Sequence, residues 1–183
     1  MWIVRRVLVT IPMICVAVAF VGAPILVDPW QVDPGTPDDA DAIIALGGIE
    51  RTASEGYRLA ETGAAPVLII ADPYEDPAAG VVTRLCRSRP VSFELSCFDP
   101  EPGTTRGEAR EIARLADEHG WDRVIVVAPV YQVTRAEWII SRCYDGELVM
   151  TDTDQRFDAL TWTYQYAYQS VAFVKAMAFQ YGC

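Results

Sequence analysis

Histidine is nearly absent from this sequence, and its scarcity limits the chemistry that the chain can perform. The only histidine among 183 residues is His119, in the segment Asp-Glu-His-Gly. We expect it to lie at the end of a helix, where a cation is favoured by the helix dipole and the role is structural. Ser-His-Asp and Cys-His mechanisms need a histidine beside the nucleophile, so both are disfavoured.

The sequence also lacks a CxxC pair, which disfavours a zinc site. Of the five cysteines, Cys15 lies in an apolar run, and the other four form an even set: Cys86, Cys97, Cys143 and Cys183. An even set in an oxidising compartment predicts two disulfides. We favour Cys86–Cys97 and Cys143–Cys183 among the three pairings that four cysteines allow. Four buried thiols are the alternative.

Metal binding would have to use carboxylates, and nothing in the pattern draws these together: Asp72, Glu75, Asp76 and Glu101. We therefore expect no metal site. The aromatic side chains of the last helix are interpreted as core and flanking residues instead of a cofactor site, and we expect no cofactor. They include Trp162, Tyr164, Tyr166, Tyr168, Phe173 and Phe179.

Charge is missing from residues 7–27, which follow Arg5 and Arg6. As a helix this run spans about 31 Å, close to the hydrocarbon core of a bilayer. No lysine or arginine recurs before Arg51, whereas five aspartates follow the run by residue 41. The positive-inside rule then predicts a single-pass anchor over residues 1–27, a cytoplasmic N-terminus and an extracytoplasmic domain at the cell membrane. Cleavage after Ala17-Val18-Ala19 is the alternative, and it also exports the domain.

Basic residues are outnumbered beyond the apolar run. Residues 28–183 hold all 25 acidic residues and all but two of the 15 basic ones. This balance argues against a nucleic-acid partner and against electrostatic adhesion to anionic lipids. Residues 28–40, rich in proline and aspartate, are interpreted as a linker, and residues 41–183 as one domain large enough for its own core.

The domain alternates continuous apolar runs with helical segments. Strands are expected at residues 41–46, 66–71, 91–97, 123–128 and 147–151. Helices are expected at residues 49–62, 80–87, 105–119, 131–143 and 157–181. Apolar strands between helices predict an α/β fold, a Rossmann-like, doubly wound and mainly parallel sheet of about five strands.

Ligands of such sheets bind beyond the carboxyl ends of the strands. Four segments should lie there: Gly47-Gly48 with Arg51, Asp72 to Asp76, Glu101 to Glu108, and Pro129 to Arg135. Gly47-Gly48 lets a ligand approach the backbone, or is simply a tight turn. Thr105 and Glu108 match the S/T-x-x-E capping box, which is a structural account of the same residues.

Arg51 and Arg135 are the strongest candidates for ligand binding. Each is expected near the start of a helix, where a cation opposes the helix dipole unless an anion compensates it. Two guanidiniums converging on one cleft would bind a phosphate or carboxylate group. The alternative is a surface pairing, either Arg51 with Glu55 or Arg58 with Glu55, which contributes only tenths of a kcal/mol.

Together these motifs resemble the DUF218 family, also called YdcF-like, over about residues 40–150. The resemblance is carried by Asp-Ala-Ile-Ile-Ala-Leu-Gly-Gly with Arg51, by Gly-Thr-Thr-Arg-Gly-Glu ending at Glu108, and by Pro-Val-Tyr-Gln-Val-Thr-Arg ending at Arg135. The cysteine pattern and last helix are similar to those of actinobacterial members. The family implies a Rossmann-like fold, often behind one membrane anchor, and SanA- or ElyC-like roles in envelope integrity or peptidoglycan precursor metabolism.

Carried over by position, the resemblance implies a ligand site made of Gly47, Gly48, Arg51, Thr105, Glu108, Gln132 and Arg135. Two positions depart from the family pattern. Gln132 stands where a histidine is usual, and Ala109 where an asparagine commonly follows the glutamate. Gln132 can form hydrogen bonds but cannot titrate, so ligand binding can survive where acid–base chemistry cannot.

Two functions are therefore expected. In the first, the cleft binds an anionic, phosphate- or nucleotide-like envelope metabolite. In the second, the domain is a non-catalytic envelope factor that acts through protein partners, and the cleft is vestigial. Glutamine at position 132 favours the second function, or a form of the first in which the cleft binds its ligand without catalysis.

Overall fold

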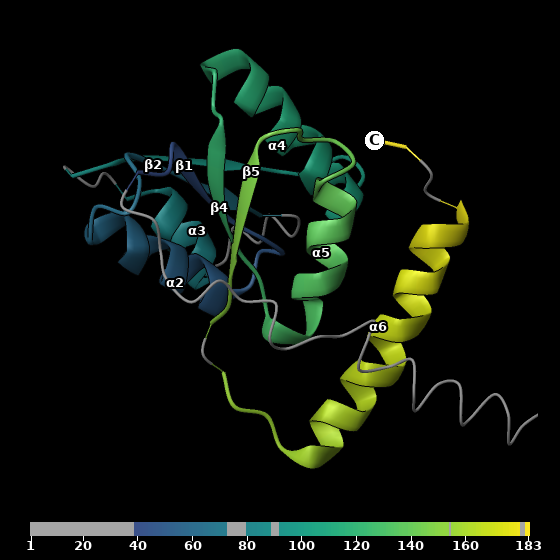
Figure 1. Cartoon of the computed structure of the whole chain (residues 1–183). Coiled ribbons are helices and arrows are strands. Elements are labelled where there is room, and N and C mark those ends of the chain that lie inside the picture. Colours follow the sequence, from purple (N-terminus) through teal and green to yellow (C-terminus); the bar gives the residue numbers. More distant parts are fainter. Residues whose placement is uncertain (1–38, 73–79, 89–91, 154, 180–181) are drawn as a thin grey trace, which may run out of the picture.

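The computed structural model describes residues 39–72, 80–88, 92–153, 155–179 and 182–183 (Figure 1). The expected membrane segment, most of the linker and the residues after Asp72 in the second loop lie outside these ranges. The strands are β1 (Ala42–Ala45), β2 (Val67–Ala71), β3 (Glu94–Phe98), β4 (Arg123–Val127) and β5 (Glu147–Thr151). The helices are α2 (Glu50–Glu61), α3 (Val81–Cys86), α4 (Thr105–His119), the 3-10 turn η1 (Val130–Gln132), α5 (Val133–Ile140) and α6 (Ala159–Phe179).

All five strands are parallel and lie in the order β3-β2-β1-β4-β5. Ile44 of β1 pairs with Ile69 of β2 on one side and with Val126 of β4 on the other. The chain thus moves outward from β1 through β2 to β3, then returns to build β4 and β5 on the opposite side. The expected Rossmann-like α/β sheet is confirmed, and its strand order reverses between β1 and β4.

Helices cover both faces of the sheet. On one face Ile44 packs in a cluster with Ile112 of α4 and Ile140 of α5. On the other face Ile43 packs in a cluster with Leu59 of α2. Because successive side chains of a strand point to opposite faces, a short apolar run such as Ala42–Ala45 buries all its residues only between two layers of helices.

Several predicted boundaries agree with the structure within one or two residues. Gly120 has a left-handed φ of 70° directly after α4, as expected of a glycine that ends a helix. The strand expected at 91–97 differs more at its start, since β3 begins three residues later, at Glu94, and ends at Phe98. The helix expected at 131–143 instead begins as the turn η1 and continues as α5 to Ile140.

Both predicted disulfides are present, and each closes a loop between elements. Cys86–Cys97 joins the end of α3 to β3, with a Cα–Cα distance of 5.8 Å. Cys143–Cys183 joins the segment after α5 to the segment beyond α6, with a Cα–Cα distance of 4.7 Å. The second bridge fastens the last helix to the sheet domain.

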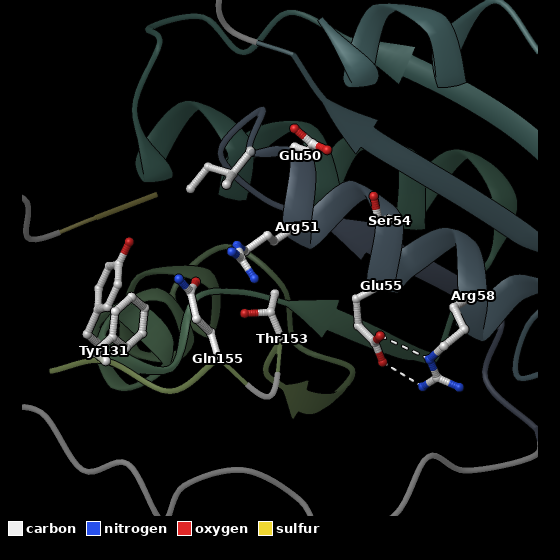
Figure 2. A pocket seen from close by; sticks show the side chains of 10 residues that line it. Glu50, Arg51, Ser54, Glu55, Arg58, Tyr131, Thr153 and Gln155 are labelled. Carbon is white, nitrogen blue, oxygen red and sulfur yellow. Dashed lines mark hydrogen bonds and ion pairs between the residues drawn. The ribbon is translucent and has the colours of Figure 1, made fainter.

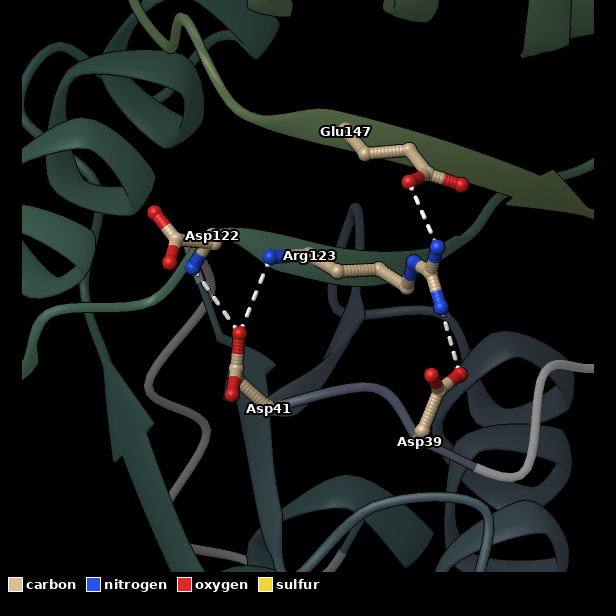
Figure 3. Close-up of polar contacts among 5 residues, drawn as sticks. All are labelled: Asp39, Asp41, Asp122, Arg123 and Glu147. Carbon is tan, nitrogen blue, oxygen red and sulfur yellow. Dashed lines mark hydrogen bonds and ion pairs between the residues drawn. The ribbon is translucent and has the colours of Figure 1, made fainter.

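The amino edge of the sheet is organised by Arg123 and Asp41 (Figure 3). The Asp41 carboxylate accepts hydrogen bonds from the main-chain N–H groups of Asp122 (2.8 Å) and Arg123 (2.9 Å). The Arg123 guanidinium pairs with Glu147 (2.8 Å) and with Asp39. These contacts join the starts of β1, β4 and β5, at the end of the sheet opposite to the expected ligand site. None of the helices in the described ranges has both the length and the apolar character needed to cross a bilayer.

Candidate functional site

The turn after β1 requires both of its glycines. Gly47 has a φ of 81° and Gly48 a φ of 58°, so both residues are in the left-handed region that disfavours side chains. The following helix is anchored by Thr52, whose hydroxyl donates to the main-chain oxygens of Leu46 and Ile49 at 2.8 Å. Gly47 and Gly48 thus form a tight strand-to-helix turn, which lies at the reversal of strand order.

Glu108 reaches this turn from a distant part of the chain. Its carboxylate oxygen Oε1 accepts a hydrogen bond of 2.6 Å from the main-chain N–H of Gly47, 61 residues earlier. Glu108 is only 3% exposed. The carboxylate therefore satisfies a main-chain donor that a left-handed turn directs away from its own backbone.

The predicted capping box is wrong by one residue. The N-cap of α4 is Thr104, whose side chain accepts from the Gly107 N–H at 3.4 Å, so Thr105 is already the first helical residue. Glu108 is then the fourth helical residue, and its carboxylate bonds to the Thr105 hydroxyl and to the Gly47 N–H instead of closing a capping box. Because the cap is made by Thr104, the side chains of Thr105 and Glu108 are available to the sheet edge.

Thr105 is the centre of a polar cluster at this edge. Its hydroxyl oxygen accepts from Nη1 of Arg135 at 3.3 Å and lies 3.4 Å from Nε2 of Gln132. Nε of Arg135 donates to Oε1 of Gln169 at 2.8 Å. The structure therefore brings together four of the predicted site residues: Thr105, Glu108, Gln132 and Arg135. Gly47 joins this cluster through its hydrogen bond to Glu108.

Burial changes the ionisation of the two charged members of this cluster. Desolvation raises the pKa of Glu108, although the Gly47 N–H, the Arg135 charge and the Thr105 hydroxyl each oppose this shift. Desolvation lowers the pKa of Arg135, and Tyr168 and Glu108 oppose that shift. Each charge thus compensates part of the cost of burying the other.

Gln169 is a member of the cluster that the sequence analysis missed. It is 2% exposed on α6 and lies on the same side of the helix as buried Phe173 and Ala176. A polar residue four and seven positions before two apolar ones, in a helix with little charge, is the signal that could have identified it.

Arg51 lies apart from Arg135. It is exposed in the first turn of α2 and lines an open pocket of about 790 Å³, among whose lining residues Arg135 does not occur. Figure 2 shows its guanidinium extending from α2 toward Thr153 and Gln155. The expected convergence of the two guanidiniums on one cleft is therefore not found.

The alternative surface pairing involves Arg58 and not Arg51. Arg58 donates to both carboxylate oxygens of Glu55, at 2.5 and 3.0 Å, which raises the pKa of Arg58. Within the part of the chain that the structure describes, Arg51 makes no ion pair. The pocket thus contains one cation without a carboxylate partner and one neutralised pair.

Aromatic rings form another wall of this pocket. Tyr131 and Phe157 lie with ring centroids 5.3 Å apart, and Trp162 packs edge-on against Phe157 at 5.9 Å. Partial burial raises the pKa of the Tyr131 hydroxyl. A flat, partly apolar wall opposite a guanidinium can hold a ring that carries an anionic substituent.

Three comparisons, with protein-family models, with curated proteins and with solved structures, found no match to this chain. A function must therefore be inferred from the geometry at the carboxyl ends of the strands. Its two parts are the buried cluster around Thr105 and the open pocket around Arg51. They are joined by the Gly47-Gly48 turn and by the adjacent residues Tyr131 and Gln132.

The remaining predicted residues lie away from these two parts or have structural roles. His119 ends α4, is exposed and stacks on Trp121 with centroids 5.1 Å apart. Glu101 is exposed in the loop before α4. The described residues contain no group of three or more histidine, cysteine or acidic side chains placed to hold a metal ion.

Proposed function

We propose that this protein is a membrane-tethered, extracytoplasmic domain of the DUF218 type that binds an anionic envelope metabolite at the carboxyl edge of its sheet. The ligand class is a phosphorylated or nucleotide-like compound, with a role in envelope integrity or peptidoglycan precursor metabolism. The observation that carries the proposal is the unpaired guanidinium of Arg51 in a pocket at the reversal of strand order.

The position of Arg51 favours an anion. A cation in the first turn of α2 opposes the helix dipole, and no carboxylate among the described residues pairs with it. Glu50 also lines the pocket, but Figure 2 shows its side chain on the opposite side of the helix start from the Arg51 guanidinium. An anionic group bound by Arg51 would compensate the unfavourable interaction of this cation with the helix dipole. The planar guanidinium of Arg51 presents several N–H donors that suit phosphate or carboxylate oxygens.

The rest of the lining fits a ring with polar substituents. Tyr131 and Phe157 offer a flat surface, whereas Ser54, Thr153 and Gln155 offer hydroxyl and amide groups. This combination of an aromatic face and a few polar groups is common where proteins bind sugars and nucleotides.

The buried cluster has a supporting role in this proposal. Glu108 holds the Gly47 N–H, and Gly48 is followed directly by the start of α2 that carries Arg51. Thr105 and Arg135 compensate the Glu108 charge and connect it to Gln132, next to Tyr131. The cluster positions two walls of the pocket without contacting the ligand itself.

Export of the domain is supported by two features. The two disulfides are typical of an oxidising compartment. The uncharged run at residues 7–27 is long enough to anchor the chain in a bilayer, with the positive charges of Arg5 and Arg6 before it.

The alternative is a non-catalytic envelope factor that acts through protein partners. Gln132 favours it, because an amide at this position supplies no proton to a reaction. The Glu108 carboxylate also favours it, because a main-chain donor already occupies it. Binding without catalysis satisfies both observations and remains part of the main proposal.

The test is a thermal-unfolding screen of the full chain in lipid nanodiscs. The probes are inorganic phosphate, sugar phosphates, nucleotides and lipid-carrier phosphate analogues. A ligand at a hundredfold excess over its dissociation constant should add about 2.7 kcal/mol to the free energy of unfolding. Arg51→Ala should abolish this gain, whereas the matched control Arg114→Ala, which removes an exposed arginine of α4, should retain it. No gain with any probe, or an equal gain in Arg51→Ala, would overturn the proposal.

A further inference from the structure

The last helix, α6, has its apolar side turned outward. Leu160, Tyr164 and Val171 are 81%, 63% and 71% exposed, and Tyr168 and Val174 are also exposed. At 100° per residue these side chains occupy one continuous arc of the helix. The residues buried against the domain, Gln169, Phe173 and Ala176, lie on the opposite arc and include the polar one.

The six aromatic residues named for this helix, interpreted from the sequence as core and flanking residues, differ in exposure. Of the six residues, only Phe173 is buried, and Tyr164, Tyr168 and Phe179 are exposed. The reason is positional, since helical periodicity places Tyr164 and Tyr168 on the side away from Gln169. The rings of Tyr164 and Tyr168 stack on each other at 6.1 Å along this outer side.

Several contacts hold this outer side in a fixed orientation. Arg135 bonds to Gln169 on the inner side, and Trp138 of α5 packs edge-on against Phe173 at 5.3 Å. Beyond the helix, Cys183 is bridged to Cys143, and its main-chain oxygen accepts from Arg106 and Arg110 at 3.1 Å. Figure 1 shows α6 standing at the side of the domain next to α5.

The charge of α6 contrasts with that of the chain. The whole protein has a formal net charge of −10, but residues 159–179 contain no aspartate or glutamate and a single lysine, Lys175. An outer surface of tyrosine, valine and leucine with one lysine avoids the repulsion that the acidic remainder would meet at an anionic membrane. Tyrosine and a long-stemmed lysine also suit the boundary between lipid headgroups and acyl chains.

The chain outside the described ranges is long enough to bring this side to a bilayer. Residues 28–38, between the apolar run and Asp39, span at most about 40 Å when extended. A domain of the size of residues 39–183 has a radius of gyration of about 15 Å, and so a width similar to that reach. Such a tether keeps the domain at the membrane and allows any of its sides to rest there.

We propose that the outer side of α6, formed by Leu160, Tyr164, Tyr168, Val171 and Val174, lies in the interfacial region of the bilayer that anchors the chain. This inference rests on the membrane tether of the proposed function. The occupant is lipid, and Tyr164 and Tyr168 lie at the level of the headgroups. The contact fixes the orientation of the domain, and with it the direction in which the carboxyl edge faces.

The test uses tryptophan fluorescence of the full chain in vesicles of brominated phosphatidylcholine. Bromine quenches only a tryptophan that enters the lipid. The added emission of Val171→Trp should fall by about half or more relative to unbrominated vesicles, because an interfacial helix buries its apolar side about 5–10 Å deep. The matched control is Glu118→Trp, at an exposed position of α4, whose added emission should not change. Flotation of the wild-type chain with the vesicles is measured in the same samples.

The outcomes separate the inference from the proposed function. A chain that floats with the vesicles but shows no quenching at position 171 overturns the membrane contact and leaves the tether intact. A blue-shifted, unquenched emission that depends on the protein-to-lipid ratio would show that the outer side of α6 packs against a second copy of the chain. This result would also overturn the membrane contact. A chain that does not float overturns the tether, and the inference with it. Ligand binding by Arg51 is measured separately, by thermal unfolding, and none of these three outcomes affects it.

Discussion

The carboxylate of Glu108 lies 2.6 Å from the main-chain nitrogen of Gly47, across 61 residues of sequence. Gly47 follows β1, and Glu108 lies on α4, which leads from β3 back to β4. The bond therefore joins the two halves of the sheet where their strand order reverses. Because Arg51 lies in the first turn of α2, which follows the same turn, this contact links the buried cluster to the open pocket.

Glu108→Ala should destabilise the protein. It removes the acceptor of the Gly47 N–H, and a buried donor left without a partner costs about 1–3 kcal/mol. Urea unfolding measures the change in the free energy of unfolding. Glu118→Ala, on the exposed side of the same helix, is the matched control and should change it by less than about 1 kcal/mol. Equal effects of the two substitutions would show that the Gly47 contact contributes nothing.

The stability contributed by Glu108 should depend on pH in a defined direction. Burial raises its folded-state pKa above the unfolded value, so its contribution is fully present below the unfolded pKa of about 4.3. The contribution is lost as the pH rises through the folded pKa, where the buried carboxyl must ionise. Wild type should therefore lose stability relative to Glu108→Gln between acidic and neutral pH. The measurement is urea unfolding of both proteins across this range. A difference that stays constant with pH would contradict the assignment.

Gln169→Leu should destabilise α6 more than a similar change elsewhere on the helix. The substitution leaves Nε of the half-buried Arg135 without its acceptor, and the loss of a hydrogen bond to a charged group costs about 1.5–3 kcal/mol. Gln165→Leu, on the same helix but outside this cluster, is the control. Hydrogen exchange should accelerate in α6 of the first variant only. Unchanged exchange in Gln169→Leu would mean that Arg135 does not hold the helix.

Removing the two disulfides should have unequal effects. The chain-entropy estimate gives about 4 kcal/mol for the 40-residue separation of Cys143–Cys183 and about 3 kcal/mol for the 11-residue separation of Cys86–Cys97. Paired serine substitutions, compared by chemical denaturation, measure both. Faster hydrogen exchange of α6 should follow only from loss of the longer bridge. The reverse order of stabilities would contradict the chain-entropy account.

Local sequence signals determined the elements of this fold. The apolar runs that became β1, β2 and β4 could be recognised because strands buried on both faces contain few polar residues. Gly63 and Gly120 marked helix ends, because a left-handed φ after a helix favours glycine. The cysteine count predicted two bridges, and the pairing favoured among the three possible ones is the one present.

The tertiary structure decided how the site residues are used. The sequence Thr-Thr-Arg-Gly-Glu allows either Thr104 or Thr105 to cap α4, and only the position of the Gly47 turn shows that Glu108 bonds across the sheet. Arg51 and Arg135 lie in the first turns of different helices, so the distance between them depends on how α2 and α5 are placed around the reversal of strand order. Periodicity alone also cannot show which side of an almost uncharged helix faces inward. In the structure the inner side of α6 contains Gln169, which accepts from the half-buried Arg135 of α5, together with Phe173 and Ala176.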